Sequence, residues 1–219
     1  MSPTLEDYTL IQRVGITGPW DEIVGRVKKD GMTVASVEDI VERRIATDRQ
    51  ACKEGAWTAE NFNYLPNGKI LIAKRADNPL IPDAREARLA HETHREHYLR
   101  EEDASRLQKI AQEDLGKEPE ARRVFILHNN DSHVVTLLGL PHDELFRFLV
   151  RDKIRAYRDL LKKQGARGMR IQVLDKTYVA KQKAPFGKAM WFDDILSGFV
   201  GNTDLTHYQP GRIYGSKPA

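Results

Sequence analysis

The chain has 219 residues, of which 40% are hydrophobic and 31% charged, a composition typical of a globular protein. No apolar run reaches the roughly 20 residues that a membrane-spanning helix needs, so we expect no membrane partner. The first residues have neither the basic nor the apolar part of a signal peptide. The single cysteine, Cys52, excludes an internal disulfide framework, and we therefore expect a cytoplasmic protein.

The net charge of +3 is distributed unevenly along the chain. Residues 1–150 contain 21 lysines and arginines against 26 aspartates and glutamates, whereas residues 151–219 contain 14 against 6. An acidic larger part and a basic C-terminal part predict two surfaces with different partners.

The first 82 residues predict two helices followed by a hairpin. Pro19 suits the first position of a helix, and Gly31 ends that helix. Ser36 can cap a second helix. A β-hairpin is predicted at 61–74, because an Asn-Gly pair between its two strands favours a tight turn.

This order of elements is that of a winged helix-turn-helix, a DNA-binding fold. The second helix would carry the basic residues Arg43, Arg44 and Arg49. Pro79 and Pro82 then favour an extended boundary. We therefore expect a winged-helix-like domain of residues 1–82 and a second domain of residues 83–219.

A long, highly charged helix is predicted at 83–115. Asp83 can cap its first turn while Glu86 reaches back to complete a capping box, and Gly116 follows its end. Because few of its residues are apolar, the helix would bridge the two parts, remain exposed or pack on another chain. The last arrangement would give an oligomer or a larger assembly.

The rest of the chain predicts a ββαββ arrangement and an irregular tail from Gly201. The expected elements are a hairpin of 123–128 with 133–138, a helix at 141–164, and a hairpin of 169–174 with 177–181. The fold class is therefore α+β, with helices packed on antiparallel hairpins and two parts bridged by the long charged helix.

Histidines supply candidate metal ligands, namely His91, His94, His128 and His133. The first two are three residues apart, not four as in a zinc-protease helix, so two could share a metal but a third would not converge with them. The other two bracket a turn with Asp131, and a His/Asp cluster suits zinc or another divalent ion. The alternative is a polar helix and a polar turn without any cofactor.

Basic residues show a clearer pattern than the histidines. In the helix predicted at 141–164, five of them are spaced by four, four, three and four residues and would share one side: Arg147, Arg151, Arg155, Arg158 and Lys162. More follow along the chain: Lys163, Arg167, Arg170, Lys176, Lys181, Lys183 and Lys188. Such a face suits a phosphate backbone or an acidic protein.

Aromatic residues near these cations could stack on bases, namely Tyr178, Phe186, Trp191 and Phe192. In the competing interpretation the arginines pair with acidic residues of their own helix and the aromatic residues belong to the core.

No glycine-rich phosphate loop, dinucleotide fingerprint or serine-hydrolase elbow occurs in the sequence. The leading hypothesis is therefore a non-enzymatic, nucleic-acid-associated binding protein that uses the basic face. One alternative is a structural or assembly protein that binds other subunits. Another is a metal-dependent hydrolase that uses the His/Asp cluster.

Overall fold

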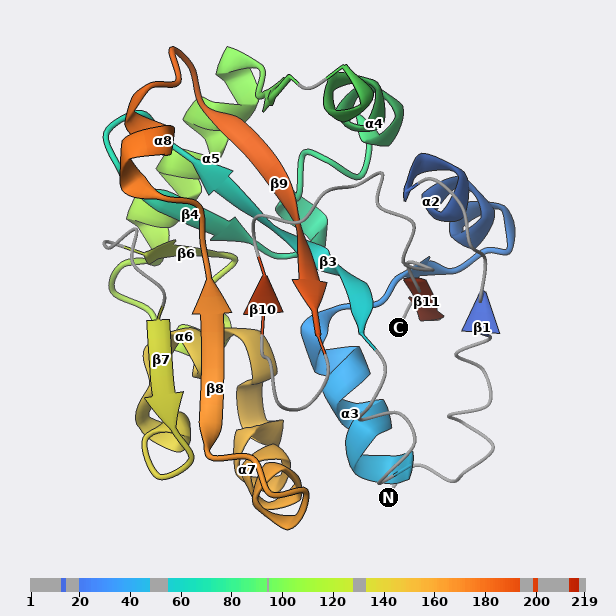
Figure 1. Cartoon of the computed structure of the whole chain (residues 1–219), viewed down its shortest axis with the longest axis vertical. Coiled ribbons are helices and arrows are strands. Elements are labelled where there is room, and N and C mark those ends of the chain that lie inside the picture. The colour runs from blue at the N-terminus through green and yellow to red at the C-terminus, as the bar shows by residue number, and fades with distance from the viewer. Residues whose placement is uncertain are drawn as a thin grey trace.

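The computed structural model describes residues 20–47, 55–93, 95–127 and 133–193, with the backbone alone at 91–92. It also describes the backbone of three short strands, 13–14, 199–200 and 213–216. The described strands belong to one mixed sheet with helices on both faces, which confirms the α+β class (Figure 1). None of the described helices combines the length and the apolar character that crossing a bilayer requires.

The strands are β1 (Arg13–Val14), β2 (Thr33–Val34), β3 (Ala56–Tyr64), β4 (Ile70–Ala73), β5 (His97–Tyr98), β6 (Val124–Leu127), β7 (His133–Thr136), β8 (Gly168–Gln172), β9 (Phe186–Phe192), β10 (Phe199–Val200) and β11 (Ile213–Ser216). Their main order is β1-β11-β3-β9-β10-β8-β7. Beside this path β4 pairs with β3 and β6, β2 pairs with β11, and β5 pairs with β9.

The helices are α2 (Trp20–Lys29), α3 (Val37–Thr47), α4 (Ala84–Glu92), α5 (Glu101–Asp114), α6 (Glu144–Val150), α7 (Ile154–Lys163) and α8 (Lys176–Ala180). Short 3-10 turns lie at Arg75–Asp77, Pro119–Ala121, Leu140–His142 and Arg151–Lys153.

Strand β3 lies at the centre of the sheet, and every one of its residues is buried. Phe62 and Tyr64 face the core formed with α3, α6 and α7. Trp57 and Ala59 face the core formed with α2 and α4. Both faces of β3 are thus covered, which explains why its sequence is not a simple alternation of apolar and polar residues.

Local signals in the first 73 residues are confirmed. Gly31 follows α2 with a φ of +69°. Ser36 Oγ accepts from the backbone N–H of Asp39 at 3.2 Å, and the Asp39 carboxylate accepts from the N–H of Ser36 at 2.7 Å, so the two residues cap α3. Strands β3 and β4 form the predicted antiparallel hairpin, and Gly68 in its turn has a φ of +83°.

Both hairpins predicted after residue 115 are wrong. Strand β6 pairs with β4, and β7 pairs with β8. Strand β6 lies beside β4, where α5 covers one of its apolar faces and α6 the other, whereas every second residue of β7 is exposed. Residues 176–180 form α8 and not a strand, because the Asp175 carboxylate accepts from the N–H groups of Thr177 and Tyr178 and caps a helix there.

The helix predicted at 83–115 is two helices, α4 and α5, with β5 between them. No aliphatic residue lies between Ala90 and Leu99, so a continuous helix would have no face to bury there. Instead β5 pairs with β9, and the N–H of Leu99 donates to the carbonyl of Pro185 at 2.9 Å.

The helix predicted at 141–164 is also divided, because Arg151 has a φ of +56° between α6 and α7. Leu145 and Phe148 are buried in α6 together with Phe146, Leu149 and Val150. A change of direction after α6 allows most sides of α6 to be covered, while α7 keeps one buried side and one exposed side.

Residues on both sides of Pro82 build the same sheet, since β3 pairs with β9 from Ala56↔Phe192 to Tyr64↔Phe186. The predicted parts 1–82 and 83–219 therefore share a sheet and a core and are not joined by a bridge helix alone. The tail predicted to be irregular from Gly201 contains β11, which pairs with β1, β2 and β3; its remaining residues lie outside the described part of the chain.

Candidate nucleic-acid interface

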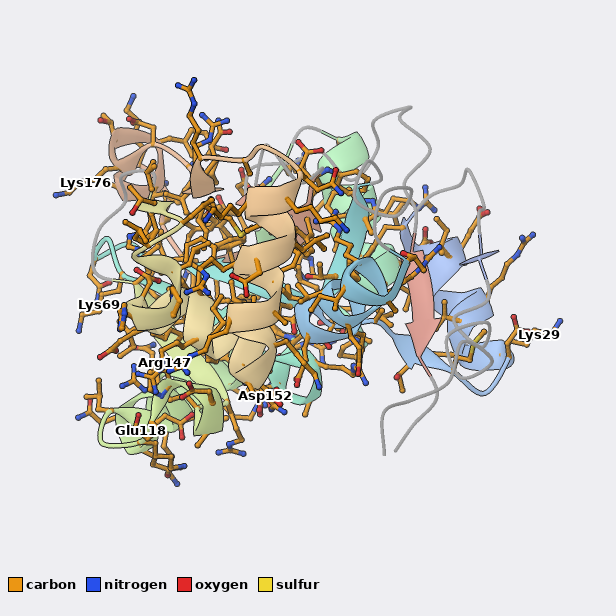
Figure 2. All side chains as sticks on the ribbon, turned by 90° about the horizontal axis from the view of Figure 1, so that it is seen from below. Lys29, Lys69, Glu118, Arg147, Asp152 and Lys176 are labelled. Atoms are coloured by element: carbon orange, nitrogen blue, oxygen red, sulfur yellow. The ribbon has the colours of Figure 1, made fainter. Side chains whose placement is uncertain are left out.

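Arg147 projects from α6 and is held by two glutamates. Its Nε and Nη2 donate to the Glu120 carboxylate at 2.7 and 3.0 Å, and Nη2 also donates to Glu118 at 2.9 Å (Figure 2). The hydrogen bonds from Arg147 lower the pKa of the Glu120 carboxyl. Arg147 therefore links α6 to the turn at Pro119–Ala121. The sequence instead predicted that it would be free to bind a phosphate backbone.

Two further arginines of the predicted stripe are paired within the chain. Nη1 of Arg151 lies 3.2 Å from Oε2 of Glu38 on α3, and Nη2 of Arg158 lies 2.6 Å from Oδ1 of its neighbour Asp159. Because α6 and α7 are separate helices, these cations lie on different elements and do not form one straight stripe.

A second set of cations is exposed and makes no ion pair with any residue in the described ranges. We name this set the basic track: Lys162, Arg167, Arg170, Lys176, Lys181 and Lys183. It begins at the end of α7, follows β8 and continues through α8. Figure 1 shows α7 and α8 at the two ends of β8, the strand that carries Arg170.

Arg170 lies on the open face of β8. Its neighbours Met169 and Ile171 are buried in the core, so Arg170 itself points to solvent. Opposite it on β7 is Val134, which is 69% exposed. Nothing among the described residues covers this face of the two strands.

Among the other predicted cations, Arg155 is likewise exposed on α7 and pairs with no described carboxylate, and Lys163 is exposed at the end of that helix. Lys188 is mostly buried and lies 2.7 Å from the Glu96 carboxylate, so it is an internal ion pair.

Most of the aromatic residues predicted to stack on bases belong to the core. Phe186 and Phe192 are fully buried, and Trp191 packs edge-on against Trp57 with 5.1 Å between ring centroids. Tyr178 is 41% exposed, and it lies on α8 among the cations of the track. Tyr98, which no sequence pattern indicated, is 47% exposed.

Of the four candidate metal ligands, only the side chain of His133 lies among the described residues. Its Nε2 is 2.7 Å from Asp143 Oδ2, and its ring stacks on Phe146. Asp143 in turn caps α6 by accepting from the N–H of Phe146 at 3.0 Å. The side chains of His91, His94 and His128 lie outside the described residues, within which no group of three His, Cys, Asp or Glu residues could hold a metal.

Arg44, predicted to face DNA in a winged-helix arrangement, is fully buried. It donates to the hydroxyl of Tyr157 at 2.9 Å and to the carbonyl of Asp193 at 2.5 Å, and it stacks over the ring of Phe192. It therefore joins α3 to α7 and β9 inside the core. Arg49 lies outside the described residues.

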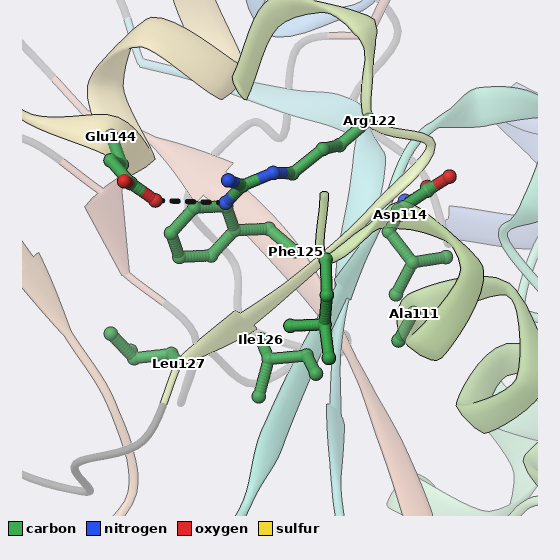
Figure 3. A pocket seen from close by; sticks show the side chains of 9 residues that line it. Ala111, Asp114, Arg122, Phe125, Ile126, Leu127 and Glu144 are labelled. Carbon is green, nitrogen blue, oxygen red and sulfur yellow. Dashed lines mark hydrogen bonds and ion pairs between the residues drawn. The ribbon is translucent and has the colours of Figure 1, made fainter. Parts of the chain in front are cut away.

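A hollow of about 370 Å³ lies between α5, β6 and α6 (Figure 3). Its polar groups already have partners: Arg122 donates to Glu144 at 2.9 Å. Asp114 accepts from the N–H groups of Arg123 and Val124 at 2.6 and 3.1 Å. The groups that line this hollow thus stabilise the fold and leave little for a ligand.

Comparisons with known proteins add information on the fold alone. No family model and no curated protein matches the chain. A solved structure described as "Accommodation of massive sequence variation in Nanoarchaeota by the C-type lectin fold" is similar, with a TM-score of 0.64. The sequence identity is 15%, over 90% of this chain and 93% of that chain.

Proposed function

We propose that this protein is a non-enzymatic nucleic-acid-binding protein that holds a phosphate backbone along the basic track. The observation that carries the proposal is the contrast between two sets of cations. Arg147, Arg151 and Arg158 are paired with carboxylates of the same chain, whereas the six cations of the track are exposed without such a pair to any residue that the structure describes.

The electrostatics of the track favour a polyanion. Of the nearby carboxylates, Asp159 pairs with Arg158, and Asp175 caps α8 while its negative charge acts on Lys181. The six like charges of the track outnumber these carboxylates and repel each other, and a phosphate backbone would relieve that repulsion while releasing its own counterions. The neighbouring exposed ring of Tyr178 offers a stacking surface.

The test is the salt dependence of binding. Each neutralised phosphate should add about 0.9 to the slope of log K against log salt for duplex DNA and about 0.7 for a single strand. Arg167→Gln together with Arg170→Gln should therefore flatten the slope by up to about two for a duplex. A control with the same loss of charge is Arg151→Gln together with Arg158→Gln, because these cations are already paired.

We expect the control to keep the wild-type slope. Two results would overturn the proposal: no binding of mixed-sequence DNA or RNA at low salt, or the same slope for the track variant and the wild type.

A structural or assembly role is the second candidate, and exposed apolar residues beside β7 favour it. Val134 is 69% exposed and Leu138 is 85% exposed. Because contact of apolar side chains with water is unfavourable, burial of these residues by a partner subunit would be favourable. Sedimentation of the wild type and of Leu138→Asp tests this role. An oligomer of the wild type that the substitution dissociates would support it. A wild type that stays monomeric at all concentrations would argue against self-association through this edge.

A further inference from the structure

A second hollow, of about 740 Å³, lies where the end of α4, strand β5 and helix α8 meet. Its lining includes Thr93, Arg95, Glu96, Tyr98, Tyr178 and Gln182. The cations Lys181 and Lys183 of the basic track are next to Gln182 in the chain and are exposed. The track thus leads to a hollow that carries two exposed tyrosine rings.

We propose that this hollow binds an unpaired base of single-stranded nucleic acid, which stacks on Tyr98 or Tyr178 while the basic track holds the flanking phosphates. The inference rests on the proposed function and names the class of nucleic acid that the track takes.

Both tyrosines are fixed in place before any ligand arrives. The hydroxyl of Tyr98 donates to Gln182 Oε1 at 3.0 Å, and the hydroxyl of Tyr178 donates to the Glu96 carboxylate. The ring of Tyr178 also packs edge-on against Phe186, with 6.4 Å between centroids. Rings that are already ordered lose little conformational entropy on binding, so their stacking energy is retained.

The charge of Glu96 does not exclude an anionic ligand. Its carboxylate is 8% exposed and lies 2.7 Å from Nζ of Lys188, which compensates its charge. The Tyr178 hydroxyl remains neutral at physiological pH, because burial and the hydrogen bond to Glu96 raise its pKa to about 12. Toward solvent the lining presents Arg95, which is exposed.

These groups suit a base better than a purely apolar ligand. An aromatic ring stacks on any base, and the exposed Arg95 guanidinium can donate to acceptors on a base edge. A base inside a duplex keeps its faces stacked on its neighbours and cannot enter such a hollow. The site should therefore favour a single strand over a duplex.

The experiment compares a 12-nucleotide oligo(dT) with a duplex of the same length. Stacking is worth about 1–3 kcal/mol per base, so Tyr98→Leu and Tyr178→Leu should each weaken single-strand binding by about 5- to 150-fold. Duplex affinity should remain unchanged, and so should the salt slope, because a tyrosine releases no counterions. Tyr98→Phe and Tyr178→Phe keep the ring and serve as matched controls.

A second measurement uses the unaltered protein. An oligonucleotide with 5-bromodeoxyuridine, cross-linked by light, should attach within residues 95–98 or 176–183. If neither strand form binds, the proposed function itself fails. If both forms bind equally well, if the Leu variants bind like the wild type, or if cross-links map only elsewhere, the base site is refuted while the phosphate track stands.

Discussion

Glu60, one of the polar residues buried on β3, allows the effect of burial on a carboxyl group to be tested. Its side chain is almost fully buried, and the N–H of Val37 at the start of α3 donates to its carboxylate at 2.9 Å. Burial raises the pKa of the carboxyl from 4.5 to about 7, against the opposing effect of that hydrogen bond. The native state therefore retains a proton on Glu60 over a pH range in which the unfolded chain has released it.

The sign and size of the effect follow from this difference. Between pH 4.5 and about 7 the native state binds more protons than the unfolded state, so the free energy of unfolding falls as the pH rises. The contribution is fully present below pH 4.5 and lost above about pH 7. Since one pKa unit corresponds to about 1.4 kcal/mol, the total loss is about 3 kcal/mol.

Glu60→Gln removes this titration and keeps an oxygen that can accept from Val37. Urea unfolding at several pH values from 4 to 8 should show the variant and wild type about equal near pH 4. The variant should gain up to about 3 kcal/mol over the wild type above pH 7. Glu102→Gln, on the exposed side of α5, corrects for the loss of one carboxylate. A difference between Glu60→Gln and wild type that stays constant with pH would refute the argument.

Two further predictions concern the fold. Gly168→Ala should lower the free energy of unfolding by about 1–3 kcal/mol, because a Cβ there would lie 2.3 Å from the carbonyl oxygen of Val135 on β7. Gly25→Ala, in open space on α2, should instead raise it by up to about 1 kcal/mol, and thermal unfolding of both would show opposite shifts. Asp114→Asn should cost about 1–3 kcal/mol at pH 7, because an amide cannot accept from all of its donors, which are Lys117, Arg123 and Val124. Burial acts to raise the pKa of Asp114, but these hydrogen bonds lower it below its usual value. The stability difference between Asp114→Asn and wild type should therefore disappear as the pH falls through that pKa. A difference that persists in acid would contradict the argument.

Helices and turns with local signals could be predicted from the sequence. The cap at Ser36, the end of α2 at Gly31 and the hairpin of β3 with β4 depend on residues within a few positions of each other. Their conformation follows from local sterics and hydrogen bonds, so a short stretch of sequence contains the necessary information.

Strand pairing could not be predicted in the same way. Strand β3 pairs with β9, more than a hundred residues later, and only the completed core decides that partner.

The break between α6 and α7 has the same origin. A helical pattern continues through Arg151, but the burial of Leu145 and Phe148 by other parts of the chain requires a change of direction.

The candidate site shows why charge patterns along a sequence need the fold for their interpretation. Arg147, Arg151 and Arg170 look alike in the sequence, and all were expected on one binding face. Folding places Glu120 and Glu38 against the first two, while β8 carries Arg170 to an open face.

Two carboxylates of the acidic larger part, Glu120 and Glu38, thus compensate Arg147 and Arg151. The cations at the end of α7, along β8 and on α8 are exposed and make no ion pair within the described ranges. A surface charge that folding leaves uncompensated costs free energy through repulsion, and a bound polyanion would recover it. Near these cations, hydrogen bonds order the rings of Tyr98 and Tyr178, which are still partly open to solvent. Exposed cations and hydrogen-bonded, partly exposed rings meet around α8, and their coincidence at one helix is the main support for the proposed nucleic-acid site.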